Sequence, residues 1–167
     1  MEPQKSIQQA LESWQQGVAS PEQVRALAAD LGNEHYSQGI PALTQLLDHD
    51  DEIVRYNAIN SLAFEFHHKP VFEKLLAIMS GDPDDDCRGA AAGGLGALFQ
   101  NSKDRRVLGA LGYSALNDPD ELVRSSAYKS LQIVNGVSRD QHLDLLRNQS
   151  LKVDPARVES ILTEISE

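Results

Sequence analysis

An internal repeat runs through the sequence. In each copy two acidic residues precede an arginine, and this arginine is followed by an alanine and then by a leucine. Three segments carry this pattern without gaps, and their arginines are Arg55, Arg88 and Arg124. Successive arginines are 33 and 36 residues apart, a period typical of stacked helical repeats. The alanine lies three residues after the arginine and the leucine seven after it, so both share one face of a helix. The chain is therefore restricted to architectures in which similar units stack on their neighbours.

Each clear copy follows an apolar stretch with helical spacing, which predicts a unit of two helices joined by a tight turn. Fainter copies surround Arg25 and follow Asp154, as expected for the ends of a stack. Ser20-Pro21, Asp82-Pro83, Asp118-Pro119 and Asp154-Pro155 each predict a helix start, with an N-cap residue before a proline at the first helical position. We expect a single domain, residues 1–167, with units at about 4–32, 33–66, 69–100, 103–135 and 138–166.

Residues 39–62 and 107–131 resemble the HEAT repeat, most closely the short bacterial form named after phycobilisome-lyase subunits. Residues 71–95 match the same pattern, except that Asp86 occupies a usually apolar position. The resemblance implies a bacterial, all-α protein that forms a right-handed α-solenoid of about five antiparallel helix pairs. It also implies that the second helix of each pair lines the concave face.

The resemblance further implies that each arginine bridges to an acid of a neighbouring repeat and so fixes the stacking. The alternative is a clamp for phosphate or carboxylate groups, which the surrounding acidic residues disfavour. The predicted structural ladder consists of Arg25, Arg55, Arg88, Arg124, Asp51, Asp84 and Asp120.

Positions one, two and five residues after each arginine are predicted to point outward and to contact a protein partner, with Tyr56 as the anchor. These residues are Tyr56, Asn57, Asn60, Gly89, Ala90, Gly93, Ser125, Ser126 and Lys129. Four glycines, at 89, 93, 94 and 96, lie in one predicted helix, where each costs about 1 kcal/mol relative to alanine. Either close packing between neighbouring second helices requires them, or they form a flat floor that a partner backbone approaches.

No pattern for catalysis is present, so we predict no catalytic residue, no cofactor and no metal ligand. The acids from Asp82 to Asp86 lack the glycine and the glutamate spacing of a calcium loop. Glu65, His67 and His68 could offer metal ligands, but adjacent histidines on a helix point in different directions.

The sequence carries 25 acidic and 15 basic residues, a formal net charge of −10. This balance argues against binding to nucleic acid. Apolar runs are too short for a membrane span, and the polar residues 1–7 favour a cytoplasmic protein; a monomer is expected. Residues 1–86 carry 15 acids and 5 bases, whereas residues 87–167 carry 10 of each. The predicted partner is a protein that turns a basic surface toward the first half of the chain.

The sequence thus predicts a non-enzymatic scaffold or adaptor that binds another protein through the concave face of a solenoid. An immunity or inhibitor protein fits the same features. From the family resemblance alone, the alternative from another class is a bilin lyase subunit, or a chaperone for bilins or phycobiliproteins.

Overall fold

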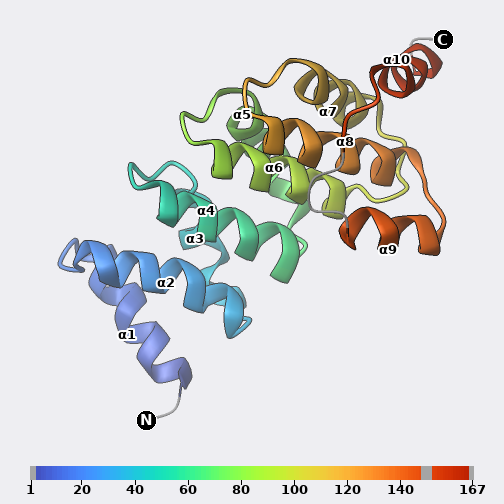
Figure 1. Cartoon of the computed structure of the whole chain (residues 1–167). Coiled ribbons are helices and arrows are strands. Elements are labelled where there is room, and N and C mark those ends of the chain that lie inside the picture. The colour runs from blue at the N-terminus through green and yellow to red at the C-terminus, as the bar shows by residue number, and fades with distance from the viewer. Residues whose placement is uncertain (1–2, 148–151, 166–167) are drawn as a thin grey trace. The chain divides into compact units, whose positions relative to one another are not determined.

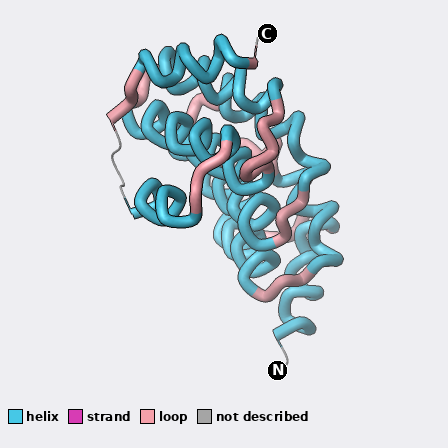
Figure 2. Tube along the Cα trace, turned by 90° about the vertical axis from the view of Figure 1, so that its right-hand side faces the viewer, coloured by secondary structure: helices cyan, strands magenta, loops and turns pink. Residues whose placement is uncertain are grey.

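The computed structural model describes residues 3–147 and 152–165, and in this part of the chain every regular element is a helix (Figure 2). The chain divides into two compact units, residues 1–71 and 72–167. Within each unit, most helices that follow one another in the sequence pack against each other. The predicted all-α class is confirmed for these residues.

The first unit contains four α-helices, in which α1 packs against α2, α3 packs against α4, and α2 also lies beside α4 (Figure 1). The helices are α1 (Pro3–Gln15), α2 (Pro21–Asn33), α3 (Ile40–Leu46) and α4 (Glu52–Asn60), with short 3-10 turns at Ser37–Gly39 and Lys69–Val71. Leucines such as Leu27, Leu31 and Leu43 are fully buried in this unit, which therefore has an apolar core of its own.

The second helix of the unit predicted over residues 33–66 changes its winding part of the way along. The α-helix ends at Asn60, and Ser61–Glu65 continue it as a π-helical turn. The amide of Phe66 donates to the carbonyl of Ser61 over 2.9 Å, a bond that spans five residues. This wider turn lies where Ser61 packs against Gly32 of α2 so closely that a side chain at position 32 would clash.

The described residues of the second unit form six helices, arranged in two layers (Figure 1). They are α5 (Phe72–Gly81), α6 (Asp85–Leu98), α7 (Arg105–Asn117), α8 (Glu121–Asn135), α9 (Arg139–Arg147) and α10 (Pro155–Glu164). Helices α6 and α8 lie side by side in one layer, and α5 and α7 lie in the other. The two layers are joined because α5 packs against α6 and α7 against α8.

In the two preceding pairs, the first helix belongs to the layer of α5 and α7, and the second helix belongs to the layer of α6 and α8. The last two helices pack against these layers in the reverse order. Helix α9 packs against α8, whereas α10 packs mainly against α7. Val158 and Ile161 of α10 are fully buried. Leu162 packs against Gly112 of α7, where an added Cβ would lie 2.7 Å from the leucine side chain. Residues 138–166 are predicted to form one more unit like the others. Among the described residues, their two helices instead pack in the reverse order.

The repeated small and large apolar positions form the core that the repeat predicts. Every one of the six side chains is fully buried, and they are Ala58, Ala91, Ala127, Leu62, Leu95 and Leu131. The alanines let neighbouring helices approach, and the leucines fill the space between layers.

The helix starts agree with the sequence at two of the four predicted sites. Pro21 and Pro155 open α2 and α10, as predicted. Pro83 and Pro119 instead lie in the preceding turns, and the N-caps of α6 and α8 are Asp84 and Asp120. In these two turns the helix begins later because the caps' own carboxylates accept hydrogen bonds from the first-turn amides.

Candidate functional site

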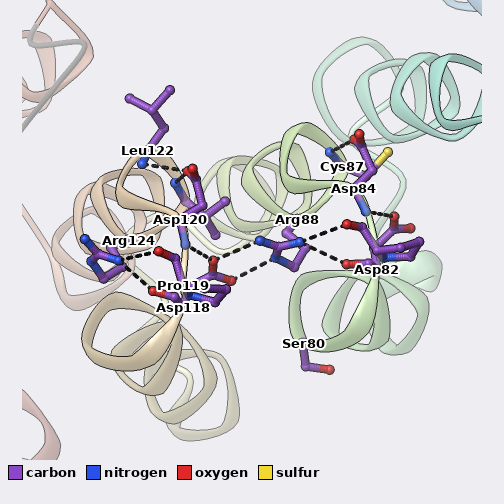
Figure 3. Close-up of polar contacts among 12 residues, drawn as sticks. Ser80, Asp82, Asp84, Cys87, Arg88, Asp118, Pro119, Asp120, Leu122 and Arg124 are labelled. Carbon is purple, nitrogen blue, oxygen red and sulfur yellow. Dashed lines mark hydrogen bonds and ion pairs between the residues drawn. The ribbon is translucent and has the colours of Figure 1, made fainter.

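Each of the three clearly repeated arginines binds the turn that precedes its own helix. In Arg55, Arg88 and Arg124, Nη1 donates to the carbonyl oxygens five and six residues earlier, over 2.7–3.4 Å. The bonds from Arg124 to Asp118 and Pro119 are 2.7 and 3.0 Å long (Figure 3). Sequence reasoning missed these bonds, although the constant offset between turn and arginine was their signal. The arginines therefore fix the turn within each repeat.

Arg88 also joins two successive repeats in the second unit (Figure 3). Its Nε and Nη2 donate to the two carboxylate oxygens of Asp118 over 2.9 and 3.1 Å. The side chains are only 12% and 7% exposed, so the bidentate pair is shielded from water. The bond to Asp118 raises the pKa of Arg88. The carboxylate that receives this arginine is thus Asp118, whereas the sequence assigned Asp84 and Asp120 to the ladder.

In the first unit, Arg25 joins two successive repeats through Asp51, which occupies the repeat position of Asp120 and not that of Asp118. Nε of Arg25 donates to Oδ2 of Asp51 over 2.8 Å, and the hydrogen bond to the guanidinium lowers the pKa of the carboxyl group. The other oxygen of Asp51 accepts from the amides of Ile53 and Val54, at 3.0 and 3.3 Å. One side chain therefore caps α4 and connects α2 to α4.

Two further acids of the predicted ladder act as helix caps. Asp84 accepts from the amide of Cys87 over 2.9 Å, and Asp120 accepts from the amide of Leu122 over 2.8 Å. Carboxylates at these positions also oppose the positive end of the helix dipole. The acid pairs of the repeat thus have a local role that is independent of any partner.

The outward positions of the first unit lie on α4. Tyr56 is 41% exposed, and Asn57 and Asn60 are half-buried. The side-chain amide of Asn57 donates to the carbonyl of Arg25 over 3.4 Å. Tyr56 therefore has the accessible aromatic surface that an anchor residue needs.

The outward positions of the second unit lie on α6 and α8, which are neighbours. Five of them are half-buried, namely Gly89, Ala90, Gly93, Ser126 and Lys129. A Cβ added to Gly89 would lie 3.9 Å from Ser126, an ordinary contact distance. Burial lowers the pKa of Lys129. The accessible surface that α6 and α8 form therefore consists mainly of small residues, together with the partly desolvated ammonium group of Lys129.

Ser125, which the sequence placed on the outward face, is instead buried, with 3% of its surface exposed. Tyr128 lies three residues further along the same side of α8, is also buried, and sits beside Asp154 at the start of α10. Asp154, at the start of α10, therefore lies beside α8 at Tyr128. A contact between Ser125 and a partner is excluded in this arrangement.

Close helix packing explains Gly96, the glycine furthest along α6. A Cβ there would lie 2.7 Å from Oγ and 3.1 Å from Cα of Ser130 on α8. Since real Cβ atoms are not found so close to other heavy atoms, only glycine fits at this position. The packing interpretation is confirmed for Gly96, while Gly93 is part of the accessible surface.

Nowhere in residues 3–147 and 152–165 do three His, Cys, Asp or Glu side chains converge as they would around a metal ion. No helix in the same ranges combines the length and the apolar character that crossing a bilayer requires.

Comparison with known proteins places the second unit in a family. A family model described as HEAT repeats matches residues 72–164, the stretch from α5 to α10. No curated protein matches the chain. The match covers more than half of the sequence and includes the repeats of Arg88 and Arg124.

Proposed function

Because this chain belongs to the HEAT-repeat family, we propose that it is a non-enzymatic scaffold that binds another protein. HEAT repeats commonly mediate protein–protein interaction, and stacked helices offer an extended surface for it. In this proposal the protein acts as a cytoplasmic monomer whose partner has a basic surface, and it binds neither nucleic acid nor membrane.

The observation that carries the proposal is the surface formed by α6 and α8. These helices pack closely through Gly96 and Ser130, and they leave Gly89, Gly93 and Ser126 partly accessible. A partner helix or extended segment can approach the backbone at these three positions, because their own side chains are small or absent. On α4 of the first unit, Tyr56 supplies an exposed aromatic group of the kind enriched in binding hot spots.

We expect the double variant Tyr56→Ala, Gly93→Arg to bind the partner at least about tenfold more weakly, since hot-spot residues carry most of an interface's free energy. The arginine places a large side chain on the surface of small residues around position 93 of α6, and the alanine removes the aromatic anchor. The partner is first captured from the native host by the immobilised full chain and identified by mass spectrometry. The purified pair is then titrated by isothermal calorimetry.

The matched control is Ala77→Arg, which adds the same side chain to an exposed position on α5, in the other layer of the second unit. This control should bind like the parent chain, and circular dichroism should show all variants folded. Undiminished affinity of a folded double variant would contradict the proposed surface.

The charge distribution supports a basic partner. All of the net charge of −10 lies in residues 1–86. Asp85 and Asp86 are exposed in the first turn of α6, where they favour an approaching positive group. Screening by salt weakens such long-range attraction, because the Debye length is about 10 Å at 0.1 M and shorter at higher ionic strength.

We therefore expect the partner's affinity to fall by about tenfold as sodium chloride rises from low to ~0.5 M, mainly through slower association. Surface plasmon resonance at several salt concentrations measures both rates. The variant Asp85→Asn, Asp86→Asn should flatten this dependence. Glu159→Gln, an exposed change in α10, should leave it unchanged. Affinity that is independent of salt would exclude a basic partner.

A further inference from the structure

A cavity of about 460 Å³ opens between α5 and α7 in the second unit. These two helices form the layer that does not contain α6 and α8 (Figure 1). This volume is within the range of sites that enclose a ligand group, roughly 300–1,000 Å³. Leu76 and Met79 line it from α5, and Ala110, Tyr113 and Ser114 line it from α7. The walls are therefore mostly apolar.

Two lining residues have properties that the core of the unit does not explain. Tyr113 is 70% exposed, one of the two most exposed large apolar side chains in the described chain. Ser114 is only 6% exposed, and within the described residues its hydroxyl has no hydrogen-bond partner. Buried hydroxyls without partners are uncommon because they cost free energy. The exposed ring of Tyr113 gives an incoming apolar side chain a surface to pack against. The hydroxyl of Ser114 can exchange a hydrogen bond with a polar group next to that side chain.

Acidic residues continue from one edge of this cavity. Asp118 and Pro119, in the turn between α7 and α8, line it, and Figure 3 shows this turn beside the turn between α5 and α6, with Arg88 joining them. The two turns carry seven acids against the two arginines 88 and 124; these acids are Asp82, Asp84, Asp85, Asp86, Asp118, Asp120 and Glu121. The carboxyl ends of α5 and α7 add the negative ends of two helix dipoles.

We propose that this cavity binds a segment of a partner protein in which one large apolar side chain lies next to lysine or arginine residues. The apolar side chain enters between α5 and α7 against Tyr113, and the basic residues lie along the acidic turns. The negative charge extends well beyond the cavity, over two turns, and so matches a chain of residues better than a compact molecule. This site is separate from the α6–α8 surface and does not depend on the function proposed for it.

The probe is a short fluorescein-labelled peptide with a central phenylalanine among alternating lysines and serines. The control peptide has glutamine in place of the phenylalanine. Fluorescence anisotropy with the full chain should show the first peptide binding about tenfold or more tightly than the second, the effect expected for burying one aromatic side chain. Equal binding of the two peptides would overturn the proposal, since only the acidic turns would then be involved.

Two variants of α7 test the location. Ala110→Phe fills the cavity and should remove the advantage of the phenylalanine peptide, whereas Gly109→Ala, whose new Cβ meets open space, should keep it. If Ala110→Phe does not fold, Tyr113→Asp at the exposed position must show the same loss. An unchanged phenylalanine preference in a folded cavity variant would overturn the proposal.

Two other occupants give distinct results. A second copy of this chain in the cavity would produce self-association that Ala110→Phe abolishes in sedimentation velocity. A small apolar ligand would make phenylalanine amide alone compete as well as the peptide. Either result overturns the assignment to a basic peptide segment.

Discussion

Replacing Arg88 with alanine is expected to lower the free energy of unfolding of the second unit by about 3–5 kcal/mol, the range found when a buried ion pair loses one partner. The Asp118 carboxylate, only 7% exposed, would lose both of its bonds to the guanidinium. The turn carbonyls of Asp82 and Pro83 would lose their shared donor as well. Urea unfolding followed by circular dichroism measures the change.

Two comparisons isolate the cause of this loss. Arg106→Ala breaks a bidentate pair with Glu73 of similar length, 2.7 and 3.0 Å, but both side chains are more than 60% exposed. Its effect should be far smaller, because water screens exposed pairs. Arg88→Lys should recover only part of the stability, since an ammonium lacks the planar fork. Equal losses for the Arg88 and Arg106 alanine variants would show that burial of the pair is unimportant.

Replacing Gly96 with valine is expected to cost about 3 kcal/mol or more, at the upper end of the range for overpacked sites. An added Cβ meets both side-chain atoms and Cα of Ser130 within 3.1 Å. Rotation of the serine cannot relieve the contact with its backbone atom, so α6 and α8 must move apart. Thermal and urea unfolding of the purified variant give the change in stability.

Gly109→Val on α7 is the matched control, because a Cβ at that position meets no atom within 4 Å. The change should stay within about 0.5 kcal/mol, the usual range for surface substitutions. Ser130→Gly should partly rescue the Gly96 variant by removing two of the three close atoms. If the valines at 96 and 109 have equal effects, the helix contact is not what requires glycine.

Binding would be affected separately from stability by the Gly96 substitution. Gly96 is buried against α8, whereas Gly93 is partly accessible on the same helix. A destabilised but folded Gly96 variant should still bind a partner through Gly93 and Ser126, which calorimetry with the purified partner measures. The four glycines of this helix therefore need not share one role.

Most of the secondary structure could be predicted from the sequence because its causes are local. Ser20 and Asp154 cap helices that open with proline, as their order in the sequence indicates. The alanine and leucine offsets identify one buried face, and all six of those side chains are buried. Such features depend on the period of a helix and on the chemistry of its first turn, both of which are encoded within a few residues.

The candidate site was less predictable, because burial depends on what packs against a helix. Ser125 has the same offset from its arginine as Tyr56, yet Ser125 is buried on α8 and Tyr56 is exposed on α4. Likewise, the repeat could not distinguish Asp118 from Asp120 as the partner of Arg88. The first is within reach of the guanidinium, and the second is engaged by amides of its own helix.

By itself, the sequence determined the helical repeat, its buried positions, the caps and the excess of acidic charge, because these follow from residue order along one helix and its turn. Only the tertiary structure decided three further features. Position 96 has room for no residue larger than glycine beside Ser130, α10 packs against α7, and α5 and α7 line an open cavity beside the acidic turns. These features depend on distances between helices that are far apart in the sequence, and such distances are set by how the side chains of both helices pack together.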